Sequence, residues 1–258
     1  DLNTFSKRNK SKIAMQGLDT AVQQRINDWL TGNYDDATKN EIQTLVDNND
    51  ANALTDAFYK DLEFGTGGLR GIMGAGSNRV NKYTLGMATQ GFSNYLLQQY
   101  PDQQIKVAIA YDNRNNSDTF AQMTADVFSA NGIYVYFFEA LRPTPELSYA
   151  IRELGCQGGV MLTASHNPKE YNGYKAYGAD GGQLVSPVDK AVLQEVRKIS
   201  SIDQINFDAK PENIETIGEE MDERFYADLV ALSVSREAIK RQKDLKIVFS
   251  PIHGTGAV

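Results

Sequence analysis

The feature that most constrains this chain is a series of short apolar segments separated by helical patterns. Three segments have the length and composition of buried strands: IKVAIAYD (105–112), GIYVYFF (132–138) and GGVMLTA (158–164). Apolar residues spaced as on one face of a helix precede, separate or follow these segments, over about 83–97, 117–130, 145–154 and 188–199. Strands that alternate with helices in this way predict an α/β fold with a largely parallel sheet.

The beginning of the chain carries a different pattern. Between Val22 and Phe58, apolar residues recur at helical spacing, which predicts a helical N-terminal extension over residues 1–60. Residues 1–14 are polar and unpatterned, and they end just before Met15. We therefore expect Met15 to be the natural start, which N-terminal sequencing of the protein from its source would test.

The last part of the chain predicts a second domain that is only begun. The polar stretch 200–217 has the composition of a linker. An amphipathic pattern over about 221–230 then precedes the apolar segment LKIVFS (245–250) and the turn PIHGTG. This order of elements is typical of the first strand of another α/β domain. We predict an α/β domain over 61–205, followed by a linker and a truncated second domain over 206–258.

Composition and charge narrow the class of protein. The net charge of −7 and the pI of about 5.0 exclude an extended basic surface for nucleic acid. No stretch approaches the roughly 18 consecutive apolar residues of a membrane span, and the N-terminus lacks the apolar core of a signal peptide. The single cysteine, Cys156, lies in the apolar segment LGCQGGV, which predicts a buried structural thiol in a reducing compartment. We expect a soluble cytoplasmic protein without nucleic-acid or membrane partners.

The segment LTASHNPKEYNGYK (162–175) gathers several reactive groups directly after the third strand. Ligands of open α/β sheets bind beyond the carboxyl ends of the strands. The Asn167-Pro168 pair would force a turn that lifts the Ser165 hydroxyl off the sheet, where it could accept a phosphoryl or acyl group. The alternative is an ordinary serine–asparagine turn in which His166 has only structural contacts.

The glycine-rich run FGTGGLRGIMGAG (64–76) also allows two interpretations. Its backbone N–H groups could form a nest for an anion, with Arg70 as a bidentate contact to phosphate. The alternative is a flexible connector, since the run matches neither a Walker A loop nor G-x-G-x-x-G after a strand.

Two further observations bear on this choice. In YDNRNNS (111–117), Asp112 and Arg114 favour an ion pair that fixes their own loop. The two histidines of the chain, His166 and His253, both follow apolar strands. Together with the serine and glycine segments, these positions favour a site that handles phosphate.

Three segments together resemble the α-D-phosphohexomutase superfamily, which includes the phosphoglucomutases and phosphomannomutases. TASHNPKEYNGYK resembles the active-site serine loop of these enzymes, and EFGTGGLRG resembles their N-terminal phosphate-proximal loop in the form of phosphoglucomutase-2-like members. LKIVFSPIHGTG resembles the opening of their second domain, and the resemblance runs in register from about residue 55 to the end. It implies domain I of this superfamily, with a largely parallel mixed sheet and helices on both faces.

The resemblance also implies a phosphoserine enzyme that interconverts hexose 1-phosphate and hexose 6-phosphate through a bisphosphorylated sugar. Ser165 would carry the phosphoryl group, and one oxygen of that phosphate would bind Mg²⁺. Lys175 would serve as general base or charge stabiliser, and Arg70 and His166 would lie beside the transferring group. The same four side chains would bind the substrate, with sugar 1,6-bisphosphate as activator. Charge neutralisation of this kind is what phosphoryl transfer needs.

The resemblance leaves part of such an enzyme outside the sequence. The family's metal loop, D-x-D-x-D-R, and its sugar-recognition loop would lie beyond Val258, so we expect the fragment alone to be inactive. A non-catalytic sugar-phosphate-binding domain is one alternative. A phosphopentomutase or a sugar-bisphosphate synthase of the same family is another, and the oligomeric state stays open.

Overall fold

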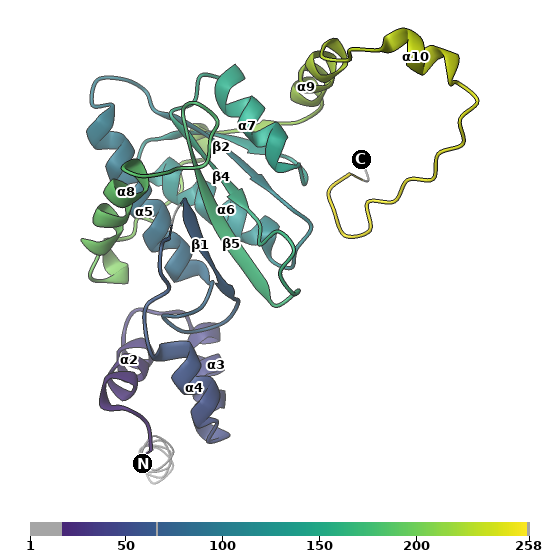
Figure 1. Cartoon of the computed structure of the whole chain (residues 1–258). Helices are drawn as coiled ribbons and strands as arrows, with labels where there is room; N and C mark the ends of the chain where they lie inside the picture. The colour runs from purple at the N-terminus through teal and green to yellow at the C-terminus, as the bar shows by residue number, and fades with distance from the viewer. Residues whose placement is uncertain (1–16, 66, 257–258) are drawn as a thin grey trace.

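A computed structural model of the chain describes residues 17–65 and 67–256. Six strands in these residues form one sheet in the order β1-β5-β4-β2-β3-β6 (Figure 1). The strands are β1 (Gly68–Ile72), β2 (Lys106–Tyr111), β3 (Tyr134–Phe138), β4 (Gly158–Leu162), β5 (Tyr171–Gly178) and β6 (Ile214–Ile217). β4, β2, β3 and β6 run parallel to one another, whereas β5 is antiparallel to both β4 and β1.

Helices connect the strands and cover both faces of the sheet (Figure 1). The helices are α2 (Thr20–Thr31), α3 (Asp36–Asp47), α4 (Ala51–Phe58), α5 (Lys82–Gln99), α6 (Ser117–Ala130), α7 (Thr144–Glu153), α8 (Val188–Arg197), α9 (Glu219–Ala231) and α10 (Arg236–Arg241). Two 3₁₀ turns, Ile202–Gln204 and Pro211–Asn213, lie between α8 and β6. The α/β fold with a largely parallel mixed sheet and helices on both faces is confirmed.

Successive side chains of each strand point to opposite faces of the sheet, so each face has its own part of the hydrophobic core. On one face, α5, α6 and α8 pack against β-strand residues in a cluster that includes Phe92, Phe128 and Tyr174. On the other face, α7 packs through Ile151 directly onto β4, where a Cβ at Gly159 would lie 2.5 Å from Ile151 Cδ1. Each fully buried side chain of this size stabilises the fold by about 1.5–3 kcal/mol.

The helices α2, α3 and α4 form a separate cluster at the lower end of the molecule in Figure 1. Trp29 stacks on Tyr34 with ring centroids 4.2 Å apart and meets Phe58 edge to face. Trp29 and Tyr34 also contact Tyr83 of α5. An aromatic cluster therefore joins the helical extension to the α/β part of the chain.

Two sequence-based predictions at the end of the chain were wrong. Residues 200–217 are not simply a linker, because Ile214–Ile217 forms β6 at the edge of the sheet, parallel to β3. Residues 245–250 are not a strand, because their side chains are exposed and no neighbouring strand pairs with them among the described residues. A strand is stable only against a partner strand or a packed face.

Other predictions concern single residues and segments. Cys156 is buried, as predicted, and burial raises the pKa of its thiol to about 12, so it is inert at neutral pH. The proposed start at Met15 lies outside the described residues. Within residues 17–65 and 67–256, every helix is too short or too polar to cross a membrane.

Candidate active site

The serine loop connects the antiparallel pair β4 and β5. Ser165 is exposed and has a left-handed backbone, with φ of 56°, a conformation that a residue other than glycine adopts only at an energetic cost. Its N–H donates to Thr163 Oγ1 at 3.0 Å, and its Oγ lies 3.3 Å from Nδ1 of the exposed His166. The structure therefore brings the two predicted loop residues into contact and presents the hydroxyl to solvent.

The loop that follows β2 supports the serine loop through the side chain of Arg114. The Arg114 guanidinium donates to the carbonyl oxygens of Ser165 and Asn167, at 2.6 Å each, and of Pro168 and Tyr171, at 3.0 and 3.1 Å. These contacts join positions more than fifty residues apart in the sequence. They are far more extensive than the local ion pair that the sequence favoured.

Asp112 links the same two loops through its carboxylate. One oxygen accepts a hydrogen bond from Thr163 Oγ1 at 2.6 Å, and the other accepts from Ser117 Oγ at 2.8 Å. The predicted ion pair with Arg114 is present, with Nε 3.6 Å from the carboxylate. Because β2 and β4 are parallel neighbours, both loops begin at the carboxyl ends of the strands, on the same side of the sheet.

Arg70 and Lys175 lie on neighbouring strands and face the same side of the sheet. In the β1–β5 pair, Arg70 is opposite Gly173 and Gly68 is opposite Lys175. Side chains two residues apart on a strand share a face, so Lys175 lies diagonally across from Arg70. A Cβ at Gly173 would lie 2.8 Å from the Leu69 and Thr163 carbonyl oxygens. Glycine at this position lets β1 and the end of β4 approach β5 closely.

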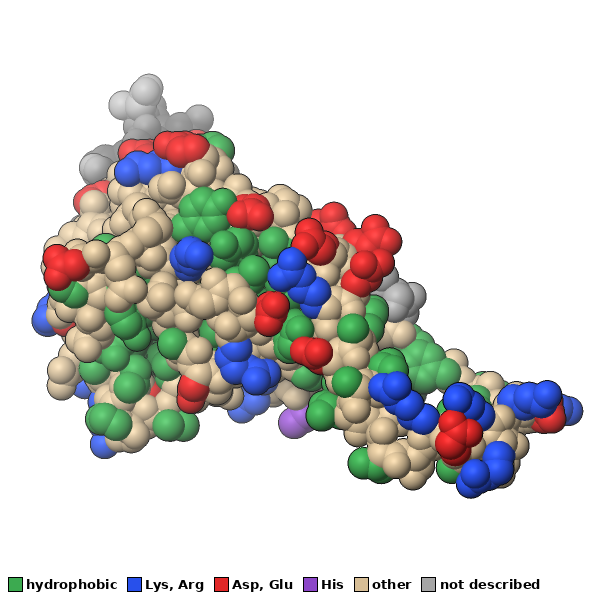
Figure 2. Space-filling model, turned by 90° about the horizontal axis from the view of Figure 1, so that it is seen from above, with side chains coloured by type: hydrophobic (Ala, Val, Ile, Leu, Met, Phe, Trp, Pro, Cys, Tyr) green, Lys and Arg blue, Asp and Glu red, His purple; other side chains and the backbone are tan. Residues whose placement is uncertain are grey.

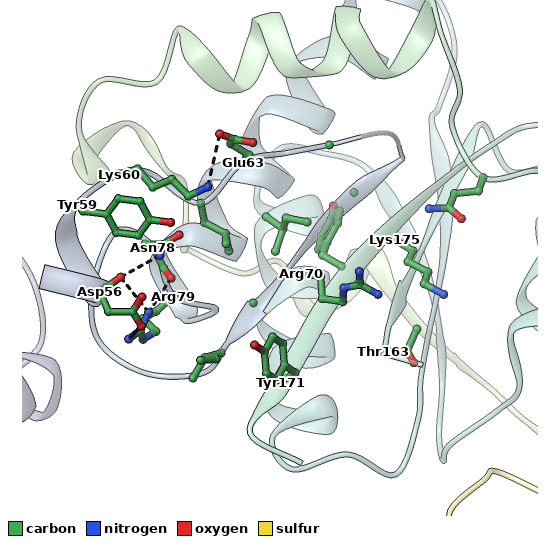
Figure 3. Close-up of a pocket in the computed structure, with 18 residues that line it drawn as sticks. Asp56, Tyr59, Lys60, Glu63, Arg70, Asn78, Arg79, Thr163, Tyr171 and Lys175 are labelled. Atoms are coloured by element: carbon green, nitrogen blue, oxygen red, sulfur yellow. Dashed lines mark hydrogen bonds and ion pairs between the residues drawn. The ribbon is translucent and has the colours of Figure 1, made fainter. Parts of the chain in front are cut away.

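The two cations line a pocket of about 580 Å³ along β1 (Figure 3). Arg70, Lys175 and Thr163 occupy one end of the pocket. Neither the Arg70 nor the Lys175 side chain makes a hydrogen bond or ion pair with the described residues. Two cationic groups without partners make this end a suitable place for an anion.

The other end of the pocket comes from the helical extension and the segment after β1 (Figure 3). Its charges are already paired: Arg79 with Asp56 at 2.7 Å and Lys60 with Glu63 at 3.6 Å. The free positive charge is therefore concentrated at the end formed by β1 and β5.

The structure brings the predicted site residues together in two adjoining groups. Arg70 and Lys175 line the pocket, whereas Ser165 and His166 stand in the exposed loop just beyond it. Thr163 joins the groups, since it lines the pocket and also binds the Ser165 N–H. His253, the other histidine of the chain, is exposed in the C-terminal segment.

Sequence reasoning missed the residues that support the loop. Asn172 is buried and donates to the Asn115 carbonyl and to Ser117 Oγ, both at 3.0 Å. Its position in YNGYK gave no sign of burial, because β5 lacks a continuous apolar run. The signal that was available is topological: polar loops that follow neighbouring parallel strands meet at one edge of the sheet.

The residues described here do not form a complete Mg²⁺ site. Residues 17–65 and 67–256 contain no cluster of three or more histidine, cysteine, aspartate or glutamate side chains that could hold a metal ion. Asp112, which lies beside the serine loop, already accepts hydrogen bonds on both oxygens. Mg²⁺ prefers a nearly octahedral set of oxygen ligands, which these side chains do not supply by themselves.

Comparison with known proteins identifies similar sequences. Residues 61–203 match the family model described as phosphoglucomutase/phosphomannomutase, alpha/beta/alpha domain I. The chain is 36% identical over 245 residues to the "Probable phosphoribomutase" of Schizosaccharomyces pombe, which covers 93% of this chain and 41% of the relative. It is 37% identical over 199 residues to the phosphoglucomutase of Staphylococcus haemolyticus, covering 77% of this chain and 36% of the relative.

A human relative and a solved structure extend the comparison. The chain is 32% identical over 252 residues to the phosphopentomutase of Homo sapiens, covering 93% of this chain and 41% of that protein. The crystal structure of a Thermus thermophilus protein described as a phosphomannomutase has a TM-score of 0.53 at 28% identity, covering 67% of this chain and 36% of that one. The chain thus spans about two fifths of the length of the relatives it matches.

Proposed function

The chain belongs to the phosphoglucomutase/phosphomannomutase family, and we propose that it is the phosphoserine-bearing part of an enzyme that interconverts hexose 1-phosphate and hexose 6-phosphate. The observation that carries the proposal is the placement of Ser165. Its exposed hydroxyl stands on a left-handed turn beside a pocket lined by Arg70 and Lys175, two cations without partners in the described residues. A phosphoryl group on Ser165 would find positive charge close at hand.

Each proposed role follows from the chemistry of phosphoryl transfer. In the first step, a sugar hydroxyl oxygen bonds to phosphorus as the bond between phosphorus and Ser165 Oγ breaks; the hydroxyl proton passes to a general base, and Ser165 Oγ, which leaves with the electron pair, takes up a proton to become a hydroxyl. Lys175 is the candidate for that base or for stabilising the oxygen charge, and Arg70 would hold two phosphate oxygens. His166 lies 3.3 Å from Ser165 Oγ and can hydrogen-bond to it. The reverse transfer, from the other position of the bisphosphorylated sugar, restores the phosphoserine.

A Mg²⁺ requirement and activation by sugar 1,6-bisphosphate belong to the same proposal. A phosphate oxygen on Ser165 would provide one metal ligand. When bound, the ion would neutralise charge on the transferring group. The side chains described here lack a cluster that could complete the coordination of the ion.

A second candidate function is a phosphopentomutase. The two relatives described above that match 93% of this chain are named phosphoribomutase and phosphopentomutase. The same Ser165, Arg70 and Lys175 would transfer a phosphoryl group to either sugar. Relative kcat/KM for hexose and pentose phosphates in the parent protein distinguishes the two.

The experiment that tests the proposal compares two serine variants of the full-length parent protein. Ser165→Ala should abolish interconversion of the sugar phosphates and leave the melting temperature unchanged, because an exposed loop hydroxyl contributes little packing. Ser200→Ala, at an exposed serine outside the site, should retain full activity. Turnover of Ser165→Ala within a few-fold of the unsubstituted parent refutes the phosphoserine assignment. If the unsubstituted parent binds sugar phosphates but does not interconvert them, a non-catalytic binding domain is favoured.

A further inference from the structure

We propose that Arg114 is a positioning residue that holds the serine loop in the conformation needed for phosphoryl transfer, an inference that rests on the proposed function. Arg114 does not line the pocket. Its side chain is 12% exposed and its hydrogen bonds reach the loop that contains Ser165. It therefore acts on the reacting hydroxyl through the backbone.

The number and kind of contacts set Arg114 apart from an ordinary surface cation. Its two terminal nitrogens donate four hydrogen bonds, all to backbone carbonyl oxygens between Ser165 and Tyr171. Hydrogen bonds from a charged donor are stronger than neutral ones. The planar guanidinium can reach several carbonyls in fixed directions, which an ammonium group cannot reproduce.

The loop needs such support because its conformation is costly. Ser165 has φ of 56°, and left-handed backbone at a residue other than glycine persists only where the surroundings enforce it. The Ser165 carbonyl is one of the two with the shortest contact to Arg114, at 2.6 Å. Arg114 therefore holds the strained residue itself as well as the turn that follows it.

Fixing the carbonyls also fixes the direction of the neighbouring N–H groups. In a trans peptide the C=O and the following N–H point in opposite directions. Because the Ser165 carbonyl faces Arg114, the His166 N–H faces away from it. This N–H makes no hydrogen bond with the described residues, which leaves it free to donate to an oxygen of a phosphoryl group on Ser165.

Asp112 holds Arg114 and the base of the loop together. Its carboxylate lies 3.6 Å from Arg114 Nε and accepts a hydrogen bond from Thr163, whose hydroxyl oxygen in turn accepts from the Ser165 N–H. Both sides of the Ser165 backbone, its N–H and its C=O, are thus tied through this pair. The segment YDNRNNS acts on the serine loop rather than only on itself.

The test uses Arg114→Ala and Arg114→Lys, with Arg25→Lys as the matched control. Arg25 also donates to a backbone carbonyl, that of Phe58, but in the helical extension. Hydrogen exchange on this chain should show protection of the Asn167 and Tyr171 amides reduced roughly ten- to hundred-fold in Arg114→Ala, the range for lost hydrogen bonds to a charged donor. The lysine variant, which keeps the charge, should restore only part of it, and Arg25→Lys should leave these amides unchanged.

Kinetics of the full-length parent separate positioning from folding. Arg114→Ala should lower kcat by about a hundred-fold, as for a misplacement of about 1 Å at a reacting group, with KM for the sugar phosphate changed only a few-fold. The lysine variant, which keeps a folded loop more readily, should show an intermediate kcat. The proposal would be overturned if Arg114→Ala left the protection of the loop amides unchanged. It would also be overturned if the loop amides lost protection in Arg114→Ala while kcat stayed at the value of the unsubstituted parent. Absence of phosphate on Ser165 and of turnover in the unsubstituted parent would refute the proposed function instead. The catalytic part of this inference would then fall with it, and the exchange data would still decide whether Arg114 holds the loop.

Discussion

Glu146 is a carboxyl group in an environment that opposes its charge. Its side chain is 1% exposed, and neither oxygen has a hydrogen-bond partner among the described residues. The nearest cation, Arg142, lies 3.9 Å away and already donates two hydrogen bonds to Asp222, at 2.7 Å each. Burial, reinforced by the negative charge of Asp222, raises the pKa of Glu146 to about 8.

This pKa predicts a pH-dependent stability. Between the ordinary pKa of 4.5 and about 8, the native chain keeps a proton on Glu146 that the unfolded chain releases. The free energy of unfolding from this group is therefore highest below pH 4.5 and falls as pH rises, by at most about 1.4 kcal/mol per pH unit. Glu146→Gln is neutral at every pH. It should therefore reduce the difference between the free energies of unfolding measured with urea at about pH 5.5 and about pH 8.

An exposed glutamate serves as the control for that measurement. Glu223→Gln, on the solvent side of α9, should leave the pH dependence of the urea midpoint as it is in the unsubstituted chain. Parallel pH profiles for Glu146→Gln and the unsubstituted chain would show that Glu146 is ionised in the native state.

Arg70 is the residue whose charge geometry the proposed function depends on. A guanidinium can hold two phosphate oxygens, whereas an ammonium acts as a point charge. Arg70→Lys in the parent should raise the barrier to transfer by about 2–4 kcal/mol, by analogy with the loss of one oxyanion-hole donor. Because the Arg70 side chain makes no hydrogen bond or ion pair with the described residues, the urea midpoint should hardly change. A lowered midpoint with an unchanged kcat would instead assign Arg70 to the scaffold.

At the scale of elements, the helical extension braces the strand that carries Arg70. β1 lies at the edge of the sheet, and the segment after it is held by the extension. Glu41 accepts a hydrogen bond from the Ala75 N–H at 2.9 Å, and the Asn78 N–H donates to the Ala57 carbonyl at 2.9 Å. The extension therefore contributes to the position of the pocket wall.

The aromatic cluster gives a direct test of this brace. Trp29 is 7% exposed and contacts Tyr34, Phe58 and Tyr83. Trp29→Ala should lower the free energy of unfolding by about 3–5 kcal/mol, the usual cost of truncating a buried aromatic side chain. Leu97→Ala, at an exposed position of α5, should cost much less. Equal urea midpoints for the two variants would mean that the extension is not packed as described.

The elements found from the sequence are those with a strong local pattern. β2, β3 and β4 are apolar runs, and α6 and α7 have helical spacing, so local composition suffices for them. β1 and β5 were missed because glycine and polar residues interrupt them, and pairing with each other and with β4 stabilises them.

The same contrast holds for the candidate site, where the local motif TASHNP was enough to indicate Ser165. The role of Arg114 depends on a contact between distant segments that no local pattern encodes.

At the scale of the whole molecule, the chain consists of a packed body and a C-terminal arm. The arm, residues 232–256, projects from the body (Figures 1 and 2). It exposes apolar side chains that a folded core would normally bury: Leu232, Val234, Ile239, Leu245, Ile247, Val248, Phe249 and Ile252. The chain covers about two fifths of its relatives, and we propose that the rest of the parent protein packs against this arm.

The side chains of the described residues predict weak metal binding by this chain. Calorimetry with Mg²⁺ should show no tight stoichiometric site, because residues 17–65 and 67–256 lack a cluster of candidate ligands. The full-length parent, titrated in parallel after phosphorylation, should bind Mg²⁺ measurably more tightly. Tight binding of one Mg²⁺ by the isolated chain would contradict this distribution of ligands.

The phosphorylation state of Ser165 across a single transfer tests the central claim most directly. The parent protein is incubated with hexose 1,6-bisphosphate, freed of small molecules and mixed with hexose 6-phosphate, while the peptide that contains Ser165 is followed by mass spectrometry. We predict that Ser165 carries one phosphoryl group before mixing, loses it only transiently as hexose bisphosphate forms, and regains a phosphoryl group as hexose 1-phosphate appears. Interconversion of the two hexose phosphates by a protein whose Ser165 never carries phosphate would contradict the proposed mechanism.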